Sequence, residues 1–205
     1  ISERKSFSAD SWDAFRYKLS FGHHDQVSRN CLQINYGLQF SDVALLSGVA
    51  STNHSWSTLL ADFNNDGDKD IFITNGASRR LNDLDYISFA GRDSMRYAPQ
   101  LSPQKVDEAI RSMPVEKTNN FFYEAVGELA FEDRSAAWGM IEETISNGAS
   151  YADLDNDGDL DLVTNNINEP ARLYQNQSEK TSRGNYLMVR LKSDDKNTFG
   201  VGAKI

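Results

Sequence analysis

The sequence has little of several residue types that mark a function or a cellular location. Cys31 is the only cysteine, which excludes a disulfide within the chain, and its alternating apolar and polar surroundings predict a small core residue. No apolar run reaches the roughly 18 residues of a membrane-spanning helix, and no stretch has the pattern of a signal peptide. Basic residues number 21 against 30 acidic ones, and the net charge of −9 argues against nucleic acid or an anionic membrane surface as a partner.

Histidine is also scarce, with three residues, and this limits the catalytic chemistry that the chain offers. The segment HHD (23–25) could begin a transition-metal site, but adjacent side chains tend to diverge, so an exposed loop is the favoured interpretation. His54 has no evident serine or cysteine partner, and a hydrolytic triad is therefore unsupported. Gly200 and Gly202 lack the third glycine of a nucleotide-binding turn, and a turn between strands explains them better.

Aspartate, by contrast, is plentiful and is concentrated in two similar nine-residue loops. Residues 62–70 read DFNNDGDKD and residues 153–161 read DLDNDGDLD, and together they hold nine of the 30 acidic residues. Each loop has an oxygen-bearing side chain at positions 1, 3, 5 and 9 and a glycine at position 6. A hard cation such as Ca²⁺ takes about 6–8 oxygen ligands, and a short loop supplies most of them only by coiling around the ion, with glycine at the sharp turn.

This spacing predicts two calcium sites, one in each loop. The side chains at positions 1, 3, 5 and 9 are the predicted ligands, together with the backbone carbonyl at position 7. The predicted ligands of the first site are Asp62, Asn64, Asp66, Asp70 and the carbonyl of Asp68, and those of the second are Asp153, Asp155, Asp157, Asp161 and the carbonyl of Asp159.

The loops begin like an EF-hand and then depart from it. An EF-hand has glutamate at position 12 and a helix on each side, whereas position 12 here is Ile73 or Thr164. The residues that follow the loops are IFITN and LVTNN, which are β-rich, so each loop is expected to join two antiparallel neighbouring strands. The alternative is that Asp, Asn and Gly merely form turns, and the recurrence of the full spacing in two copies disfavours it.

The two loops belong to an internal repeat. Asp62 and Asp153 are 91 residues apart, and the segment FSDVALLSGV (40–49) aligns with FEDRSAAWGM (131–140) at the same offset. The shared approach to each loop indicates that a whole structural unit is repeated.

The repeat also extends upstream of these segments. Asn30 corresponds to Asn120 with a slip of one residue, and RLYQN (172–176) resembles the beginning of a third copy. Several short strands separated by turns are typical of a β-propeller blade, which buries its faces by stacking on its neighbours. We therefore expect an all-β fold, a partial β-propeller whose two blades do not close a ring.

Residues 79–118 interrupt the repeat with a helical pattern. Ser102 followed by Pro103 offers an N-cap and a first-turn proline, and apolar residues recur at helical spacing up to Met113. A shorter helix is suggested within 81–89. We interpret the segment as a helical insertion between blades that packs against the side of the propeller, although it could instead carry the specific function.

The loops within strand pairs and the approach FSDVALLSGV resemble the FG-GAP and VCBS repeats of integrin-α-like propellers. The C-terminal stretch is similar to the start of an ASPIC/UnbV domain, in which an NYLxVxL strand precedes a polar turn and G-x-GA-x-[VI]. The matching residues here are Asn185, Tyr186, Leu187, Val189, Leu191, Gly200, Gly202, Ala203 and Ile205. The combination resembles the bacterial relatives of cartilage acidic protein, which implies calcium-binding blades in a secreted or surface-held protein, anchored for instance to the outer membrane.

The expected organisation follows from the repeat and the resemblance. The chain begins at Ile1 without an initiator methionine and ends at Ile205 in an apolar stretch, so we expect a piece of a larger protein. Its expected segments are 1–28, the end of a preceding blade or an insertion; 29–78 and 119–168, the two repeats with calcium loops; 79–118, the helical insertion; 169–183, the start of a further repeat and a linker; and 184–205, the start of the ASPIC/UnbV domain.

Two functions from different classes stay open. The first is a non-enzymatic scaffold for binding or adhesion, stabilised by calcium, that presents loops to an unknown protein or glycan ligand and stacks on further blades of the same protein. The alternative is a fragment of an extracellular polysaccharide-active enzyme with structural calcium, which a cleft holding two carboxylates outside the loops would favour. Trp12, Trp56 and Trp138 could stack on sugars, but the last two lie beside predicted strands, and core packing is favoured for them.

Overall fold

A computed structural model describes residues 12–23, 29–80, 86, 102–181, 186–192 and 196–204. Three helices and nine short strands lie in these residues. The helices are α1 (Trp12–Ser20), α3 (Pro103–Ser112) and α4 (Ser178–Thr181). The strands are β1 (Gln33–Asn35), β2 (Phe40–Asp42), β3 (Ser55–Ala61), β4 (Asp70–Asn75), β5 (Phe121–Gly127), β6 (Ala130–Asp133), β7 (Ser146–Ala152), β8 (Asp161–Asn166) and β9 (Arg172–Tyr174).

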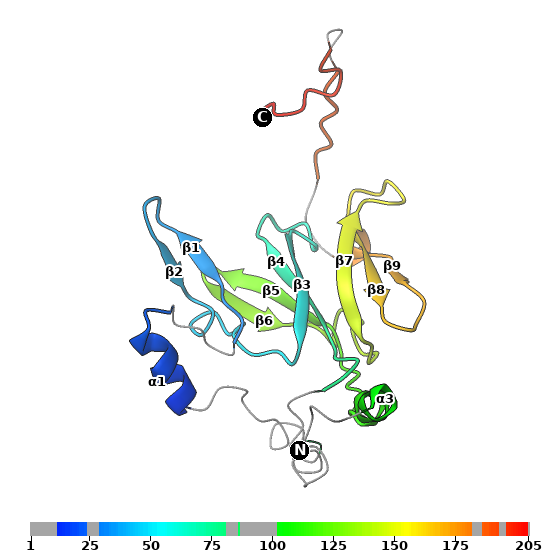
Figure 1. The fold of residues 1–205 in the computed structure, drawn as a ribbon. Helices are drawn as coiled ribbons and strands as arrows, with labels where there is room; N and C mark the ends of the chain where they lie inside the picture. The colour runs from blue at the N-terminus through cyan, green and yellow to red at the C-terminus, as the bar shows by residue number, and fades with distance from the viewer. Residues whose placement is uncertain are drawn as a thin grey trace.

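The strands form three antiparallel sheets that lie next to one another (Figure 1). β1 and β2 pair with each other, β3 to β6 form a four-stranded sheet in chain order, and β7 to β9 form a three-stranded sheet. The prediction of an all-β protein is therefore confirmed for the described residues. The three sheets do not by themselves close a ring, so the propeller stays a prediction.

β4 is one of the two inner strands of the largest sheet, and its sequence explains its position. All six residues of DIFITN are buried, whereas β3 at the edge alternates between half-buried and exposed residues. A strand covered on both faces needs a continuous run of residues that tolerate burial. An edge strand with one face in solvent instead needs buried and exposed residues to alternate. Neighbouring elements therefore cover both faces of β4.

Two hydrophobic clusters hold the sheets together. One cluster joins the turn after β2 to the strands β4 and β5, through Ala44, Val49, Ala50, Ile71, Ile73 and Tyr123. The other joins the four-stranded sheet to the three-stranded sheet, through Ala61, Phe63, Phe72, Phe122, Met140 and Leu162. The Phe122 ring meets the Phe63 and Trp138 rings edge-on, with centroids 4.9 Å apart in both pairs. The four-stranded and three-stranded sheets thus bury apolar residues against each other, and the turn after β2 packs on β4 and β5.

The sequence repeat is present in the structure as a repeated turn after β2 and after β6. Asp42 Oδ1 accepts a hydrogen bond from the Ala44 amide at 3.1 Å, and Asp133 Oδ1 accepts one from the Ser135 amide at 2.9 Å. In both places an aspartate ends the strand and holds the first turn after it. The predicted 91-residue repeat is therefore confirmed at this position.

The sheets nevertheless combine the end of one repeat with the beginning of the next. Ile71 of β4 pairs with Tyr123 of β5, and Leu162 of β8 pairs with Tyr174 of β9. β9 therefore stands at the same place beside β8 as β5 does beside β4. This is the arrangement expected of a third copy that begins at residues 172–176.

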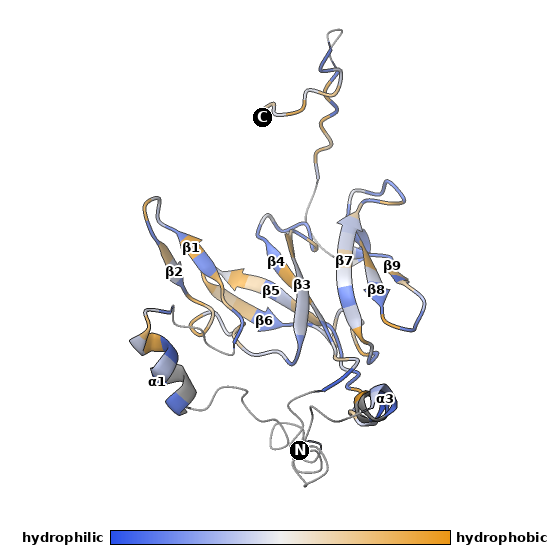
Figure 2. Ribbon diagram, viewed as in Figure 1, coloured by the Kyte–Doolittle hydropathy of each residue, from blue (hydrophilic) through white to orange (hydrophobic). Residues whose placement is uncertain are grey.

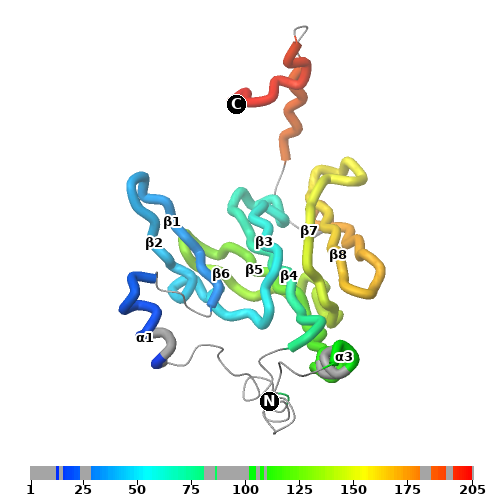
Figure 3. The backbone as a smooth tube through the Cα atoms, viewed as in Figure 1, coloured from blue at the N-terminus to red at the C-terminus, as the bar shows by residue number. Residues whose placement is uncertain are grey.

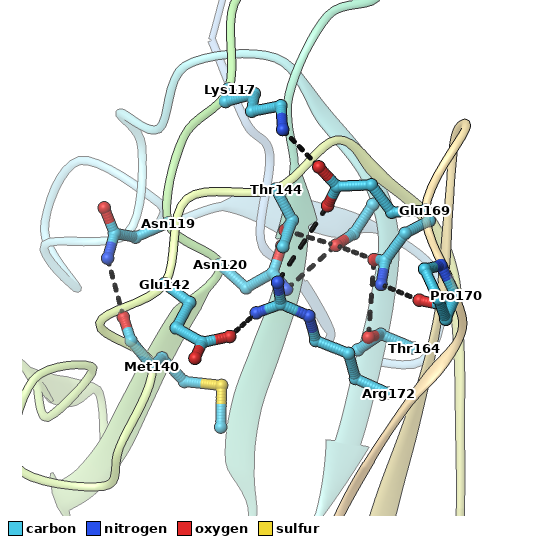
Figure 4. Close-up of polar contacts among 12 residues, drawn as sticks. Lys117, Asn119, Asn120, Met140, Glu142, Thr144, Thr164, Glu169, Pro170 and Arg172 are labelled. Carbon is cyan, nitrogen blue, oxygen red and sulfur yellow. Dashed lines mark hydrogen bonds and ion pairs between the residues drawn. The ribbon is translucent and has the colours of Figure 1, made fainter.

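A buried polar network joins the four-stranded sheet to the three-stranded sheet (Figure 4). Asn120 accepts a hydrogen bond from the Asn75 amide at 2.9 Å and donates to Ser146 Oγ at 3.0 Å. Ser146 in turn donates to Asn166 Oδ1 at 2.7 Å. Asn30 makes the corresponding contact with a serine, Ser55, at 3.1 Å, which confirms the predicted slip of one residue between Asn30 and Asn120.

Cys31 and the C-terminal segment differ from the predictions. The Cys31 side chain is exposed, so its prediction as a core residue is wrong. β1 begins at Gln33, beyond Cys31, and the strand alternation that suggested burial does not extend to the cysteine. Residues 186–192 form no strand, although the resemblance implied one, and Leu187 is 86% exposed. This segment stands away from the sheets in Figure 3 and pairs with no described strand, and a strand needs such a partner.

α1 and α3 lie outside the sheets (Figure 1). α3 confirms the helix predicted after Ser102, but every α3 side chain that the structure describes is exposed, which gives no support to the predicted packing against the sheets. The described part of the first segment contains α1, and its assignment to the end of a preceding blade or to an insertion stays a prediction. The shorter helix predicted within 81–89 lies outside the described residues except for Tyr86. A helix that could span a bilayer is absent from the described residues.

Candidate metal centre

Both aspartate loops join antiparallel strands at the same end of the molecule (Figure 1). Ala61 pairs with Asp70 where the first loop leaves β3 and enters β4, and Ala152 pairs with Asp161 in the second. Figure 2 shows that the loop between β7 and β8 is largely hydrophilic. The predicted strand–loop–strand arrangement is confirmed for both loops.

The second loop brings three carboxylates together. One oxygen each of Asp153, Asp155 and Asp157 lies within 4.8 Å of the others. Oxygens that share a calcium ion, each about 2.3–2.6 Å from it, are at most about 5 Å apart, so this grouping has the dimensions of a coordination shell. Asp153 Oδ1 is buried and has no hydrogen-bond partner, whereas Asp153 Oδ2 accepts a bond from the Gly158 amide at 3.2 Å. The donor set therefore fits a calcium ion.

Left-handed backbone at two positions curves each loop. Asn65 and Gly67 in the first loop have φ values of 58° and 98°, and Asn156 and Gly158 in the second have 63° and 91°. Asparagine and glycine adopt this region most readily, which is the physical reason for N-x-G at positions 4 to 6. The two loops thus share one backbone shape.

The first loop has the same shape but different side-chain bonding. Asp62 accepts hydrogen bonds from the amides of Asp66 and Gly67 at 3.1 and 2.9 Å. The Asn64 side-chain amide donates to Asp66 Oδ2 at 2.9 Å and to Glu124 Oε1 at 3.2 Å. Among the described residues, the groups of three converging acidic side chains all include members of the second loop. Calcium in the first loop, with Asp62, Asn64, Asp66 and Asp70 and the carbonyl of Asp68 as ligands, stays a prediction.

The aspartate at position 9 ties each loop to the following strand. Asp70 accepts hydrogen bonds from the amides of Phe63 and Ala125, at 3.1 and 3.0 Å. Burial is the main cause that raises the pKa of Asp70 to about 6, and these two bonds oppose the rise. In the second loop, Asp161 accepts from the amides of Leu154 and Asn176, at 3.0 and 2.9 Å. Both residues have a structural role that the ligand prediction did not include.

Position 7 of the second loop also has a role that the sequence analysis missed. Asp159 was predicted to contribute its backbone carbonyl, but its side chain is 1% exposed and accepts hydrogen bonds from the Ser178 amide and hydroxyl, at 3.0 and 3.1 Å. Burial raises the pKa of Asp159 to about 6. Glu179 lies beside Asp159 and was not predicted, because it follows the repeat by many residues. The signal that could have found it is a Ser-Glu pair directly after the third repeat start.

A cavity of about 890 Å³ lies between the first loop and the three-stranded sheet. Three aromatic rings contribute to its wall, those of Phe122, Trp138 and Tyr174, and its polar lining includes Asn64, Asp66, Glu124, Gln175 and Asn176. Glu124 is the one lining carboxylate outside the loops, and Arg134 binds it at 2.6 Å. The cavity therefore does not hold a pair of free carboxylates.

Tyr186 covers the turn of the second loop. A Cβ atom built on Gly158 would lie 1.9 Å from Tyr186 Cε1, so the ring packs directly against the glycine. Tyr186, in the segment with the predicted ASPIC/UnbV pattern, therefore contacts the second loop. Gly158 is needed here both for its φ value and for this close approach.

The remaining sequence candidates form no site among the residues that the structure describes. His23 is exposed, and His24 and Asp25 lie outside the described residues. His54 Nδ1 lies 3.3 Å from Glu116, which Arg80 also binds at 3.0 Å. These contacts connect β3 to the chain after α3.

The tryptophans give a mixed result. Trp138 packs against the second hydrophobic cluster, as predicted. Trp56 is 57% exposed and donates a hydrogen bond from Nε1 to the Gly76 carbonyl at 2.6 Å, so the prediction that it lies in the core is wrong. β3 is an edge strand, and Trp56 lies on its solvent-exposed face. The Trp12 side chain is not among those that the structure describes.

The chain matches no protein-family model, and no curated protein matches it. The resemblance to FG-GAP and VCBS repeats and to the ASPIC/UnbV domain therefore stays a prediction.

Proposed function

We propose that this chain is a calcium-binding β-propeller segment of a secreted or cell-surface protein and that it serves as a scaffold for binding or adhesion. The observation that supports the proposal most is the convergence of Asp153, Asp155 and Asp157 within 4.8 Å, with Asp153 Oδ1 buried and unpartnered. When bound, the ion would supply charge neutralisation for carboxylates that otherwise repel one another. The loop itself holds its ends together through the position-9 aspartate.

The edges of the outer sheets support the propeller part of the proposal. β1 corresponds to β5, which pairs with β4, but β1 has only β2 as its described partner. β9 also corresponds to β5, which pairs with β6, but β9 has only β8. Further blades of the same protein would supply the missing neighbours, as stacked repeats require.

The cavity favours a scaffold over an enzyme. Cleavage of a glycosidic bond uses two carboxylates about 5–10 Å apart, one of them free to exchange a proton. Glu124, the lining carboxylate outside the loops, is held by Arg134 and by Asn64. Aromatic rings beside amide side chains suit the binding of a protein loop or a glycan instead, because they offer apolar faces and hydrogen bonds together.

Calorimetric titration of chelator-treated protein with calcium tests the metal part of the proposal. We expect saturable binding. The Asp153→Asn variant should no longer bind the calcium ion of the second loop, because one of the anionic ligands of that ion is gone. Asp107→Asn is the matched control, since Asp107 is exposed on α3 and the charge change is the same. If Asp153→Asn binds as many calcium ions with the same affinity as the unaltered protein, the assignment of calcium to the second loop is wrong.

Binding of the calcium-loaded protein to arrayed glycans and matrix proteins tests the scaffold part. We expect retention that chelator abolishes, because the loops that line the cavity lose their order without metal. Release of soluble sugar from a polysaccharide, with multiple turnovers per chain, would instead establish the enzyme alternative.

A further inference from the structure

Helix α4 places a carboxylate beside the second loop. One oxygen each of Asp157, Asp159 and Glu179 lies within 4.8 Å of the others, which is again the spacing of oxygens around a calcium ion. Glu179 is outside the nine-residue loop, and the loop's predicted ligand set includes neither its carboxylate nor the Asp159 side chain. The grouping therefore has a different set of ligand atoms from the loop site. The two sets share the Asp157 carboxylate, whereas Asp159 would give its side chain to one and its carbonyl to the other.

The Asp159 side chain gives an independent indication of a ligand. It is 1% exposed, and both Ser178 donors bind the same oxygen, Oδ2. The other oxygen, Oδ1, is buried and has no hydrogen-bond partner. Buried carboxylate oxygens without partners are costly and rare, and an unpaired one commonly marks the position of an ion. Ser178 fixes the orientation of Asp159 in the way that outer residues orient metal ligands.

We propose that Asp157, Asp159 and Glu179 bind a second divalent cation next to the loop site, with Asp157 shared between the two ions. All of the donors are carboxylate oxygens, and such a set selects a hard cation, of which calcium tolerates an irregular arrangement best. A carboxylate has two oxygens and is able to bridge two ions. The inference rests on the proposed function only in that Asp157 is also a ligand of the loop ion.

One neighbouring cation competes for Glu179. Lys180 Nζ lies 3.3 Å from Glu179 Oε1, and the two side chains are 61% and 29% exposed. Such a partly exposed pair contributes little free energy. A divalent ion among three carboxylates therefore outcompetes the lysine.

The experiment counts bound ions by equilibrium dialysis against radioactive calcium, over a range of free calcium concentrations. The variants are Glu179→Ala and the control Glu128→Ala, since Glu128 is exposed on the turn between β5 and β6. We expect Glu179→Ala to bind one calcium ion fewer per chain than the unaltered protein, and Glu128→Ala to bind the same number. Glu179 is at the surface, so the fold should survive the change.

A second readout uses Mn²⁺ in place of calcium. Two manganese ions that share a carboxylate are magnetically coupled, so the electron paramagnetic resonance spectrum of the loaded protein should show a coupled pair that Glu179→Ala converts to isolated ions. An unchanged ion count and spectrum in Glu179→Ala would overturn this inference and leave the loop site intact. No bound ion in the unaltered protein would overturn the proposed function itself.

Discussion

The side-chain amide of Asn65 donates a hydrogen bond to the carbonyl oxygen of Gly158, at 3.3 Å, and so connects the two aspartate loops. Asn65 is position 4 of the first loop, and Gly158 is position 6 of the second. Asn176, two residues after β9, adds a second connection by donating to the Phe63 carbonyl at 2.6 Å. An ion that orders one loop therefore orders a hydrogen-bond partner of the other.

Replacement of Asn65 by glycine should weaken the coupling between the two sites. Glycine keeps the left-handed backbone and removes only the side-chain donor, which contributes about 0.5–1.5 kcal/mol, or roughly a twofold to tenfold change in affinity. In calorimetry, the variant should bind its first calcium ion as the unaltered protein does and should bind the next ion more weakly than the unaltered protein does. Asn156→Gly is the control, because Asn156 has the same loop position and backbone but is exposed. Equal effects of the two variants would show that the connection carries no coupling.

The second loop should bind calcium about tenfold more tightly than the first, a difference of roughly 1.4 kcal/mol. Position 3 is Asp155 in the second loop and the neutral Asn64 in the first, and Lys69 places a positive charge in the first loop. Calorimetry on Asp62→Ala and Asp153→Ala, each of which keeps one loop intact, measures the difference. Tighter binding by the protein that keeps only the first loop would show that ligand charge does not set the affinity.

Removal of calcium should lower the melting temperature markedly. Without the ion, the converging carboxylates of Asp153, Asp155 and Asp157 repel one another, and opening of the loop relieves the repulsion. Thermal unfolding of verified metal-loaded protein, with and without chelator, measures the effect, and added calcium should restore the original curve. Superimposable unfolding curves with and without chelator would show that the loops are ordinary turns that calcium does not stabilise.

The fold class, the repeat and the strand–loop–strand units could be predicted because they depend on local chemistry. The spacing of oxygens and glycine fixes the curvature of the loop, and the apolar runs after the loops fix β4 and β8. The pairing of β4 with β5 across the insertion could not be derived from local pattern, since it depends on which edge is free. Trp56 was placed wrongly for the same reason, because the period-two pattern does not say which strand ends a sheet. Cys31 was placed wrongly because β1 begins only at Gln33, so the alternation does not reach the cysteine.

The side-chain roles of Asp159 and Glu179 could not be derived from the loop pattern. A nine-residue pattern assigns each position a role within its own loop, and Asp159 was therefore assigned only its carbonyl. Its partner Ser178 lies 19 residues further on. Only the turn of the chain after β9 into α4 brings them together.

Asp70→Asn should destabilise the protein even without calcium. Both Asp70 oxygens accept backbone hydrogen bonds, and the amide group of asparagine would leave one buried donor unpaired, at about 1–3 kcal/mol. Urea unfolding in chelator should show this loss, whereas Asp66→Asn, on an exposed residue of the same loop, should change it little. The same unfolding free energy in both variants would mean that Asp70 does not hold the loop to β5.

Gly76→Ala should cost about 2–5 kcal/mol of folding stability. Gly76 has a φ of 120°, and its Cβ would lie 2.6 Å from the Thr144 carbonyl oxygen, so strain and overpacking combine. Gly37→Ala is the control, because its φ is 90° but its Cβ would meet nothing within 4 Å. Denaturant unfolding should show a clearly larger loss of stability for Gly76→Ala than for Gly37→Ala. Equal losses would mean that the backbone at Thr144 moves away from the added methyl group at no cost.

The pairing of β4 with β5 spans residues 76–120 and therefore bears on how the protein is synthesised. Closing that long segment costs only about 1.5 kcal/mol more than closing the short loop before β4, so the insertion is tolerated at equilibrium. On a ribosome that adds about 5–20 residues per second, however, β4 waits roughly 2–9 s for β5. During that interval β4, the one described strand whose residues are all buried in the final fold, has an open edge that other chains could pair with. Calcium captured early by the hairpin of β3 and β4 would hold that edge in place until its partner arrives.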